Sequence, residues 1–271
     1  MVLFWNKSWN YRGLIIALLL ILSLFINNRA ASEFLSGTVN KGRVISESGT
    51  VLNKQTGKPI AGAKVSIPSA NVETRTNQLG KFQLDMPDKK PLILSVKASG
   101  YKPFSLIIDE SNSQKPMEIG IEQTDNEVVI DTRLHHLGDN NFSERSANAT
   151  DFSMPAAGPF YFQEFFLDNT QSNNILLKIG SIIGIDTMTA RELRQSRVLN
   201  SSSSPVKVFF NSHKVGEINF NGNNHIFRIP VSLLRTNSYN HVRIETGVNL
   251  NSGSRTDYDD IEFINLMLEF H

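Results

Sequence analysis

The stretch that decides how this chain folds is Thr56-Gly57-Lys58-Pro59-Ile60-Ala61-Gly62-Ala63-Lys64-Val65-Ser66-Ile67. Its first half has the composition of a tight turn, because Gly57 adopts a positive φ without strain and Pro59 fixes the backbone around it. In its second half every second residue from Ala63 to Ile67 is apolar, and such residues share one face of an extended strand. A turn that leads into a strand with one apolar face predicts a β-sheet lying over a hydrophobic core.

The same pattern continues along the chain, with short β-branched and aromatic runs between clusters of Gly, Pro, Asn, Asp and Ser, and it is typical of β-sandwiches and barrels. The predicted strands are 43–46, 63–67, 81–84, 92–97, 104–108 and 118–122, then 128–134, 160–167, 175–183, 206–210, 214–218, 225–229, 241–245 and 261–270. One short helix is predicted where Thr189 and Glu192 have capping-box spacing. The polar stretch 123–127 separates the two series. We therefore expect an all-β fold of two β-sandwich domains, at 37–125 and 127–271.

Motifs on both sides of the opening stretch sharpen the prediction for residues 37–125. In order along the chain they include Gly42-Arg43-Val44, Thr74-Arg75-Thr76, Gly80-Lys81-Phe82 and Gly100-Tyr101. The series resembles the carboxypeptidase regulatory-like domain, a small transthyretin-like β-sandwich. The resemblance implies a folding or interaction module with no catalytic role, and the zinc-ligand spacing of the peptidases is absent. Asn77 or Gln78 stands where this family usually has Asp, which predicts a weaker side-chain cap on that turn.

A second series of motifs lies in residues 127–271. It consists of Val206-Lys207-Val208-Phe209-Phe210-Asn211, Phe227-Arg228-Ile229-Pro230, Tyr239-Asn240-His241-Val242 and Asp259-Asp260-Ile261. The series resembles the galactose-binding-like β-sandwich, the jelly roll used by many carbohydrate-binding modules. Ser212 replaces a turn glycine of that pattern, and Asn237 or Ser238 replaces a later one. The resemblance implies that this domain binds the ligand.

The first 32 residues have the composition of an export segment. Lys7 and Arg12 precede an apolar run of thirteen residues, 14–26, and Ala30-Ala31-Ser32 follows at the spacing of a cleavage site. Thirteen residues are short for a transmembrane helix, so a cleaved signal peptide is expected. The alternative is an N-terminal membrane anchor that the nearby aromatic residues lengthen. Both alternatives export the rest of the chain to the periplasm, the cell surface or the extracellular space.

Composition excludes several classes of function. The chain has 271 residues and no cysteine, which excludes a disulfide framework, a thiol nucleophile and a Cys-ligated metal. The net charge is +1, and removing the three basic residues of the leader takes it to −2. A chain so close to neutral lacks the basic surface that nucleic-acid binding requires. Both tryptophans lie in the leader, so the exported domains have no Trp platform for a flat polysaccharide.

Two oxygen-rich segments are candidate metal ligands. The first, at 137–141, contains Asp139 and Asn141, and the second, at 257–262, contains Asp259, Asp260 and Glu262. In the jelly-roll family the ends of the first and last strands often meet and hold a structural calcium ion, so the resemblance implies Ca²⁺ bound by these five residues. Calcium prefers carboxylate, amide and carbonyl oxygens. The alternative is that these Asp and Asn side chains cap turns.

Tyrosines are the candidates for stacking on a sugar ring. Tyr161, Tyr239 and Tyr258 each combine an apolar ring with a polar tip, and most of the phenylalanines in the run 160–166 are expected in the core. His135 and His136 are adjacent in a predicted strand, so they point to opposite faces and are not expected to share a metal.

These patterns predict an exported, non-catalytic protein that binds a surface or extracellular polysaccharide through residues 127–271. An adaptor for an envelope protein, with both sandwiches structural, is the second hypothesis. A polysaccharide lyase or hydrolase ranks lowest, because the sequence contains no Gly-x-Ser-x-Gly elbow and no His-Glu-x-x-His motif. Membrane contact is expected only through the N-terminal segment.

Overall fold

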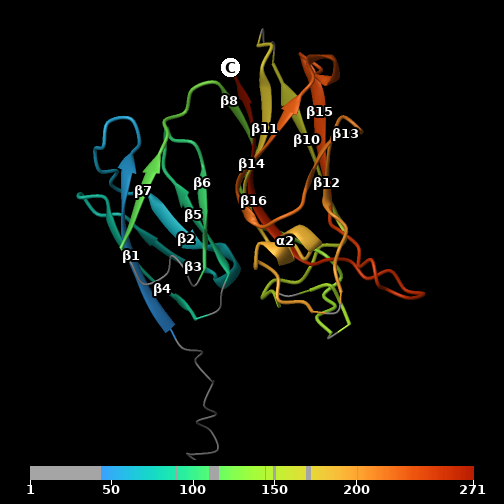
Figure 1. The fold of residues 1–271 in the computed structure, drawn as a ribbon. Helices are drawn as coiled ribbons and strands as arrows, with labels where there is room; N and C mark the ends of the chain where they lie inside the picture. Colours follow the sequence, from blue (N-terminus) through green and yellow to red (C-terminus); the bar gives the residue numbers. More distant parts are fainter. Residues whose placement is uncertain are drawn as a thin grey trace, which may run out of the picture. The chain divides into compact units, whose positions relative to one another are not determined.

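The computed structural model describes residues 44–88, 91–109, 116–143, 145–148, 151–168, 172–199 and 201–271. The predicted export segment and the Gly42 motif lie outside these residues. The described part is nearly all β, which confirms the predicted fold class (Figure 1). No helix in the described part of the chain is long and apolar enough to cross a membrane. Val44–His271 forms one compact unit, which contains two β-sandwiches.

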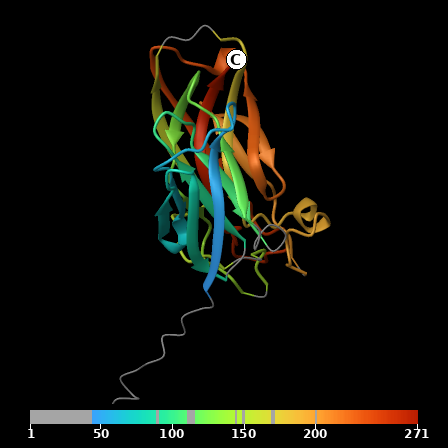
Figure 2. The ribbon, with the colours of Figure 1, turned by 90° about the vertical axis from the view of Figure 1, so that its left-hand side faces the viewer.

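The first sandwich is built from a three-stranded and a four-stranded sheet. The smaller sheet has the order β4-β1-β7 and contains β1 (Val44–Asn53), β4 (Lys81–Pro87) and β7 (Met117–Ile121). The larger has the order β3-β2-β5-β6 and contains β2 (Lys64–Ile67), β3 (Val72–Arg75), β5 (Leu92–Lys97) and β6 (Phe104–Ile108). In Figure 2 the long strand β1, in blue, lies nearest the viewer. Alternate residues such as Val65, Ile67, Phe82 and Leu84 form the core between them.

The turn before β4 shows how local chemistry fixes this sandwich. Gly80 has φ +70°, and a Cβ there would lie 2.5 Å from the Val51 carbonyl oxygen, so glycine is required. Asn77 Oδ1 accepts hydrogen bonds from the backbone N–H groups of Leu79 and Lys81, at 2.9 and 3.0 Å. The departure from the usual Asp therefore leaves the cap intact, because the amide oxygen of Asn77 accepts the same hydrogen bonds.

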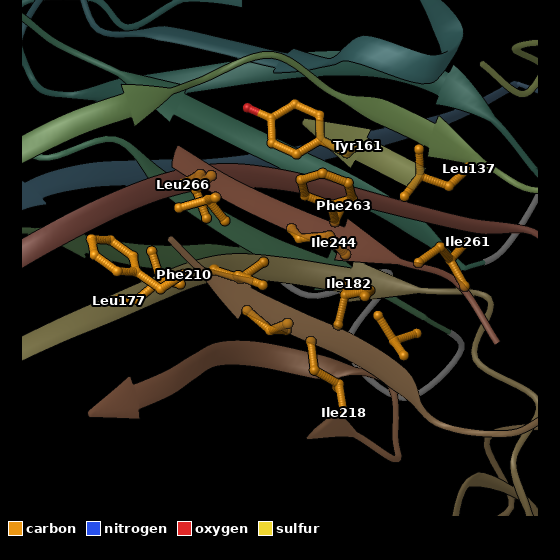
Figure 3. Packing of buried hydrophobic residues seen from close by; sticks show 14 of the residues in the cluster. Leu137, Tyr161, Leu177, Ile182, Phe210, Ile218, Ile244, Ile261, Phe263 and Leu266 are labelled. Atoms are coloured by element: carbon orange, nitrogen blue, oxygen red, sulfur yellow. The ribbon is translucent and has the colours of Figure 1, made fainter. Parts of the chain in front are cut away.

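The second sandwich is built from a five-stranded and a four-stranded sheet. The larger has the order β14-β11-β16-β8, with β9 also paired to β16, and contains β8 (Glu127–Asp131), β9 (His135–Leu137), β11 (Ile175–Ile183), β14 (Gly222–Ile229) and β16 (Ile261–Phe270). The smaller has the order β10-β15-β12-β13 and contains β10 (Phe160–Leu167), β12 (Val206–Phe210), β13 (His213–Ile218) and β15 (Ser238–Glu245). Figure 3 shows part of the core between them, where Leu177, Phe210 and Phe263 are fully buried.

Most predicted strands occur in the structure, and the differences are local. The prediction missed β3, a short strand of alternating half-buried and exposed residues. The predicted strand 128–134 is interrupted, and β8 and β9 pair with successive parts of β16. The helix α2 (Met188–Glu192) begins earlier than predicted, because the Thr187 hydroxyl, not that of Thr189, accepts the capping hydrogen bond from the Ala190 N–H. A capping-box match alone does not identify which threonine takes the extended N-cap conformation.

Candidate functional site

The two oxygen-rich segments meet at one end of the second sandwich because β9 pairs antiparallel with the start of β16. Leu137 is opposite Ile261 in this pairing. The loop that follows β9 and the loop that precedes β16 are thereby brought side by side. Together they line a polar cavity of about 550 Å³, called the loop cavity below. Its lining residues are Asp139, Asn140, Asn141, Ser143, Arg145, Asn249, Asn251, Ser252, Gly253, Arg255, Thr256 and Asp257.

Asp260 joins the two loops but faces the protein interior. Its carboxylate accepts hydrogen bonds from the backbone N–H groups of Asp139 and Asn140 and from Asn148 Nδ2, at 3.3, 3.1 and 2.9 Å. Its Oδ1 also lies 2.8 Å from His136 Nε2, which is buried. Both carboxylate oxygens are therefore already in contact with nitrogen atoms of the protein.

The aspartates that line the loop cavity are also engaged. Asp257 accepts from Asn141 Nδ2 at 2.5 Å, from the Ser146 hydroxyl at 3.0 Å and from Asn249 Nδ2 at 2.8 Å. Asp139 accepts from the backbone N–H groups of Asn141 and Tyr258, both at 3.1 Å. Asp139 thus caps the turn at Asn141, whereas Asp257 binds three side chains.

The other two predicted metal ligands lie away from the loop cavity. Asp259 is fully buried and accepts hydrogen bonds from the Ser203 hydroxyl at 2.6 Å and the Asp186 N–H at 3.1 Å. Burial and the nearby negative charge of Asp186 raise the pKa of Asp259 well above its usual value. Glu262 is buried in β16, opposite His136 and Ile183.

Calcium therefore finds a poor fit among these five residues. In the described part of the chain no three His, Asp or Glu side chains are placed to hold a metal ion. Asp139 caps a turn, as the alternative predicts, and Asp259 and Asp260 accept hydrogen bonds from elsewhere in the protein. Calcium binding stays a prediction from the resemblance.

The three predicted tyrosines have different surroundings. Tyr161 is a correction to the predicted sugar-binding set: its side chain is only 7% exposed and packs against Phe263, as Figure 3 shows. Its hydroxyl donates to Asp131 Oδ2 at 3.2 Å. Burial first, and the negative charge of Asp131 next, raise the pKa of Tyr161. Tyr258 is half-buried beside the loop cavity, whereas Tyr239 is exposed on β15.

Asp131 organises the charged groups around Tyr161. Burial raises its pKa, but hydrogen bonds from the side chain and backbone of Arg133, and the neighbouring His135, outweigh this effect and hold the pKa well below its usual range. The His135 ring packs against the rings of both Tyr161 and Phe263, whereas His136 Nε2 forms a hydrogen bond with Asp260. The two histidines do have different partners, as their adjacent positions in a strand predict.

A row of exposed aromatic side chains covers the outer face of β10 and β15. We call Phe160, Phe162, Phe166 and Tyr239 the aromatic face; each is between 48% and 62% exposed. Phe166 is opposite Tyr239 across the two strands, with ring centroids 5.3 Å apart in an edge-to-face arrangement. The Phe162 and His241 ring centroids are 5.1 Å apart. The prediction that most of these phenylalanines are core residues was wrong, because Tyr161, Phe165 and Leu167 face the core instead.

Polar and charged groups lie within the aromatic face. Glu164 is opposite His241, and Phe162 is opposite Arg243. The Arg243 guanidinium lies 4.3 Å from the centre of the Phe209 ring and forms a 3.0 Å ion pair with Glu245. Partial burial first, and the positive charge of Arg235 next, lower the pKa of His241, so its ring is neutral at pH 7 and can both donate and accept a hydrogen bond.

The fold and these sites define a class: an all-β protein of two sandwiches with a candidate binding surface on the second. Residues 47–131 match the family model of the CarboxypepD_reg-like domain, which confirms the resemblance of the first sandwich. No curated protein sequence matches the chain.

Two solved structures similar to the chain come from Bacteroides species. One, a candidate carbohydrate-binding protein from Bacteroides uniformis ATCC 8492, is 12% identical over 83% of this chain and 98% of that chain, with a TM-score of 0.23. Another, a candidate membrane-associated protein of unknown function from Bacteroides fragilis NCTC 9343, is 10% identical over 83% of this chain and 97% of that chain, with a TM-score of 0.24.

Proposed function

We propose that this chain is an exported, non-catalytic protein whose second sandwich, a galactose-binding-like jelly roll, binds a polysaccharide. The observation that carries the proposal is the aromatic face. A protein domain rarely leaves several large aromatic side chains half-exposed on one face of a sheet unless the surface binds something. Aromatic rings on a rigid sheet provide such a surface with little loss of side-chain entropy.

The chemistry of the aromatic face suits a sugar chain. The apolar C–H faces of sugar rings match the exposed rings of Phe162, Phe166 and Tyr239. Sugar hydroxyls require both donors and acceptors beside those rings. Glu164 supplies an acceptor and the Tyr239 hydroxyl supplies both kinds of group. His241, whose Nε2 lies 3.2 Å from the Ser212 hydroxyl, supplies one more through Nδ1. An extended chain lying along β10 would contact these groups in succession.

A second function, an adaptor for an envelope protein, is favoured by one specific observation. β10 is an edge strand of its sheet, and three of the four aromatic-face residues are phenylalanines without a hydrogen-bonding group. Apolar side chains beside a free strand edge are also what a protein partner uses when it adds a strand. The two functions place different ligands on the same surface.

A glycan array of the purified full-length chain tests the proposal. We expect binding to at least one polysaccharide, and a loss of at least about tenfold in affinity in the double variant Phe166→Ala, Tyr239→Ala, since each removes an aromatic contact. Phe220→Ala is the matched control, because Phe220 is a partly exposed phenylalanine outside the aromatic face and should leave binding unchanged.

The same array, run with calcium and with a chelator, also tests the predicted metal. Absence of any glycan binding in both conditions would overturn the proposal. If cross-linking in cells then captured a stoichiometric protein partner that the double variant fails to bind, the adaptor function would replace it.

A further inference from the structure

The loop cavity presents hydrogen-bond donors where the sequence predicted calcium ligands. We infer that it binds an anionic group carried by a sugar, a carboxylate or a sulfate, through the guanidinium groups of Arg145 and Arg255. This inference rests on the proposed glycan-binding function and adds a second site to it, since no residue of the aromatic face lines the cavity. A volume of about 550 Å³ is in the range of small-molecule sites, which hold about 300–1,000 Å³.

The main carboxylate and amide acceptors of the loop cavity are bound by other groups of the protein. The carboxylate oxygens of Asp139 and Asp257 accept hydrogen bonds from within the protein. The Asn249 side-chain oxygen accepts from the Ser201 hydroxyl and from the Asn251 N–H, and its Nδ2 donates to Asp257 and to the Arg145 carbonyl oxygen. These acceptor groups are thus occupied by the protein, and a ligand must be recognised by other groups.

The loop cavity also contains two cationic hydrogen-bond donors. Arg145 and Arg255 both line the cavity and both side chains are exposed. Among the residues that the structure describes, neither guanidinium has an ion-pair partner. Each presents several N–H donors in a planar fork that matches the two oxygens of a carboxylate or of a sulfate. The unused groups of the cavity therefore include two cationic donors, beside the hydroxyls of Ser143 and Thr256.

One charge opposes an anion here. Asp139 is exposed at the cavity, and its negative charge is only partly offset by the N–H groups that bind it. Replacing Asp139 with Asn keeps an oxygen acceptor and removes the charge. This substitution should strengthen the binding of an anion, whereas it would weaken a calcium site.

Affinity electrophoresis of the full chain tests the inference, with gels that contain polygalacturonate, dextran sulfate or dextran. We expect retardation in polygalacturonate or in dextran sulfate, which separates a carboxylate from a sulfate ligand, and none in neutral dextran. The double variant Arg145→Gln, Arg255→Gln should weaken this retardation at least about tenfold, because charge-assisted hydrogen bonds are lost. Asp139→Asn should increase it.

The matched control is Arg194→Gln, Arg228→Gln, which removes the same charge from two exposed arginines outside the cavity. An equal loss in the control would show non-specific attraction and overturn the inference. Abolition of binding by a chelator would also overturn it and favour calcium. Since the Arg255 guanidinium has no hydrogen-bond or ion-pair partner among the described residues, Arg255→Gln alone provides a folded variant if the double variant does not fold, and it should weaken retardation by several-fold.

The failure of the inference is distinguishable from that of the proposed function. If the glycan array shows binding to neutral glycans that requires Tyr239, and no acidic polysaccharide retards the chain, then glycan binding stands and the anion site is refuted. If no glycan of any charge binds, both fail.

Discussion

Gly138 and Asp260 meet at the point where the loop after β9 crosses β16. Gly138 has φ +145°, and a Cβ at this position would lie 2.3 Å from the Asp260 Cγ atom. The approach is this close because Asp260 accepts the N–H groups of the next two residues, Asp139 and Asn140. Glycine is therefore required here both for its backbone conformation and for space.

Gly138→Ala is predicted to displace Asp260 from its donors and to lower the free energy of unfolding by about 3–5 kcal/mol, the usual cost of breaking a buried charged network. Urea unfolding followed by circular dichroism measures the change. Gly158→Ala is the matched control, because Gly158 also has a positive φ, +115°, but open space around its Cβ position. Equal losses in the two variants would show that backbone strain, and not the contact with Asp260, determines the cost.

Asp259 predicts a dependence of stability on pH. Its pKa is raised in the folded protein, so the folded state binds this proton more tightly than the unfolded state does. The stabilisation is complete below the unfolded pKa, about 4, and is lost as the pH rises through the folded pKa. Asp259→Asn is neutral at every pH. The melting temperature of this variant relative to the wild type should therefore increase from pH 4 upward, and a difference that stays flat or falls would contradict the prediction.

At the scale of elements, β10 shows what alternation can and cannot predict. The strand has the predicted limits, Phe160–Leu167, because aromatic and β-branched residues between turn residues strongly favour a strand. Its orientation was not predictable, since both of its faces are apolar and period-two alternation does not say which face is inside. The packing partners decide it: Tyr161 packs on Phe263 of β16 in the facing sheet and Phe165 on Phe210 of β12, which leaves the even-numbered phenylalanines outside.

The two faces of this sheet should respond differently to loss of a hydroxyl. Tyr161→Phe removes the hydrogen bond to the buried Asp131 and should lower the free energy of unfolding by about 1–2 kcal/mol. Tyr239→Phe, on the exposed face of β15, should change it by less than about 0.5 kcal/mol. Urea titrations of both variants measure the difference. A larger loss of unfolding free energy for Tyr239→Phe than for Tyr161→Phe would contradict the assignment of Tyr161 to the buried face and Tyr239 to the exposed face.

For the loops, the sequence predicted which segments meet but not the partners of their side chains. Their polar composition was evident, and the family resemblance placed the two acidic segments together, as β9 and β16 now do. The partners of the individual oxygens were not predictable. Whether Asp260 binds a cation or accepts N–H groups depends on donors as distant in sequence as His136 and Asn148. Arg145 and Arg255 could not be predicted as binding residues, because exposed arginines in loops have no distinctive sequence pattern.

At the scale of the whole molecule, the two sandwiches share buried contacts within the unit Val44–His271. Ile93 of β5 packs in one cluster with Ile183 and Ile264 of the second sandwich. The hydroxyls of Ser105 and Ser181 are 2.8 Å apart, beside Gly180, where a Cβ would lie 2.5 Å from the Ser105 hydroxyl oxygen. The strands could be predicted from the sequence one by one, but this contact depends on residues far apart in the chain.

Ion pairs also link the two sandwiches. Lys102 lies 3.3 Å from Glu269 and 3.7 Å from both Glu122 and Glu127, and Lys178 lies 3.2 Å from Glu269. Attraction to these carboxylates outweighs the cost of burial and raises the pKa of Lys102. Because a buried cluster and a charged network join the sandwiches, we predict one unfolding transition in calorimetry, with equal calorimetric and van't Hoff enthalpies. Two separated transitions would contradict this coupling.

The central claim is that a glycan binds on the aromatic face of β10 and β15. The most direct measurement is nuclear magnetic resonance of the chain labelled on its Phe and Tyr rings, titrated with a glycan that the array identifies. If the glycan binds on the aromatic face, the ring signals of Phe162, Phe166 and Tyr239 should shift together as the glycan is added, while those of the buried Tyr161 and Phe263 should not shift. Binding that leaves the three exposed rings unchanged would contradict it.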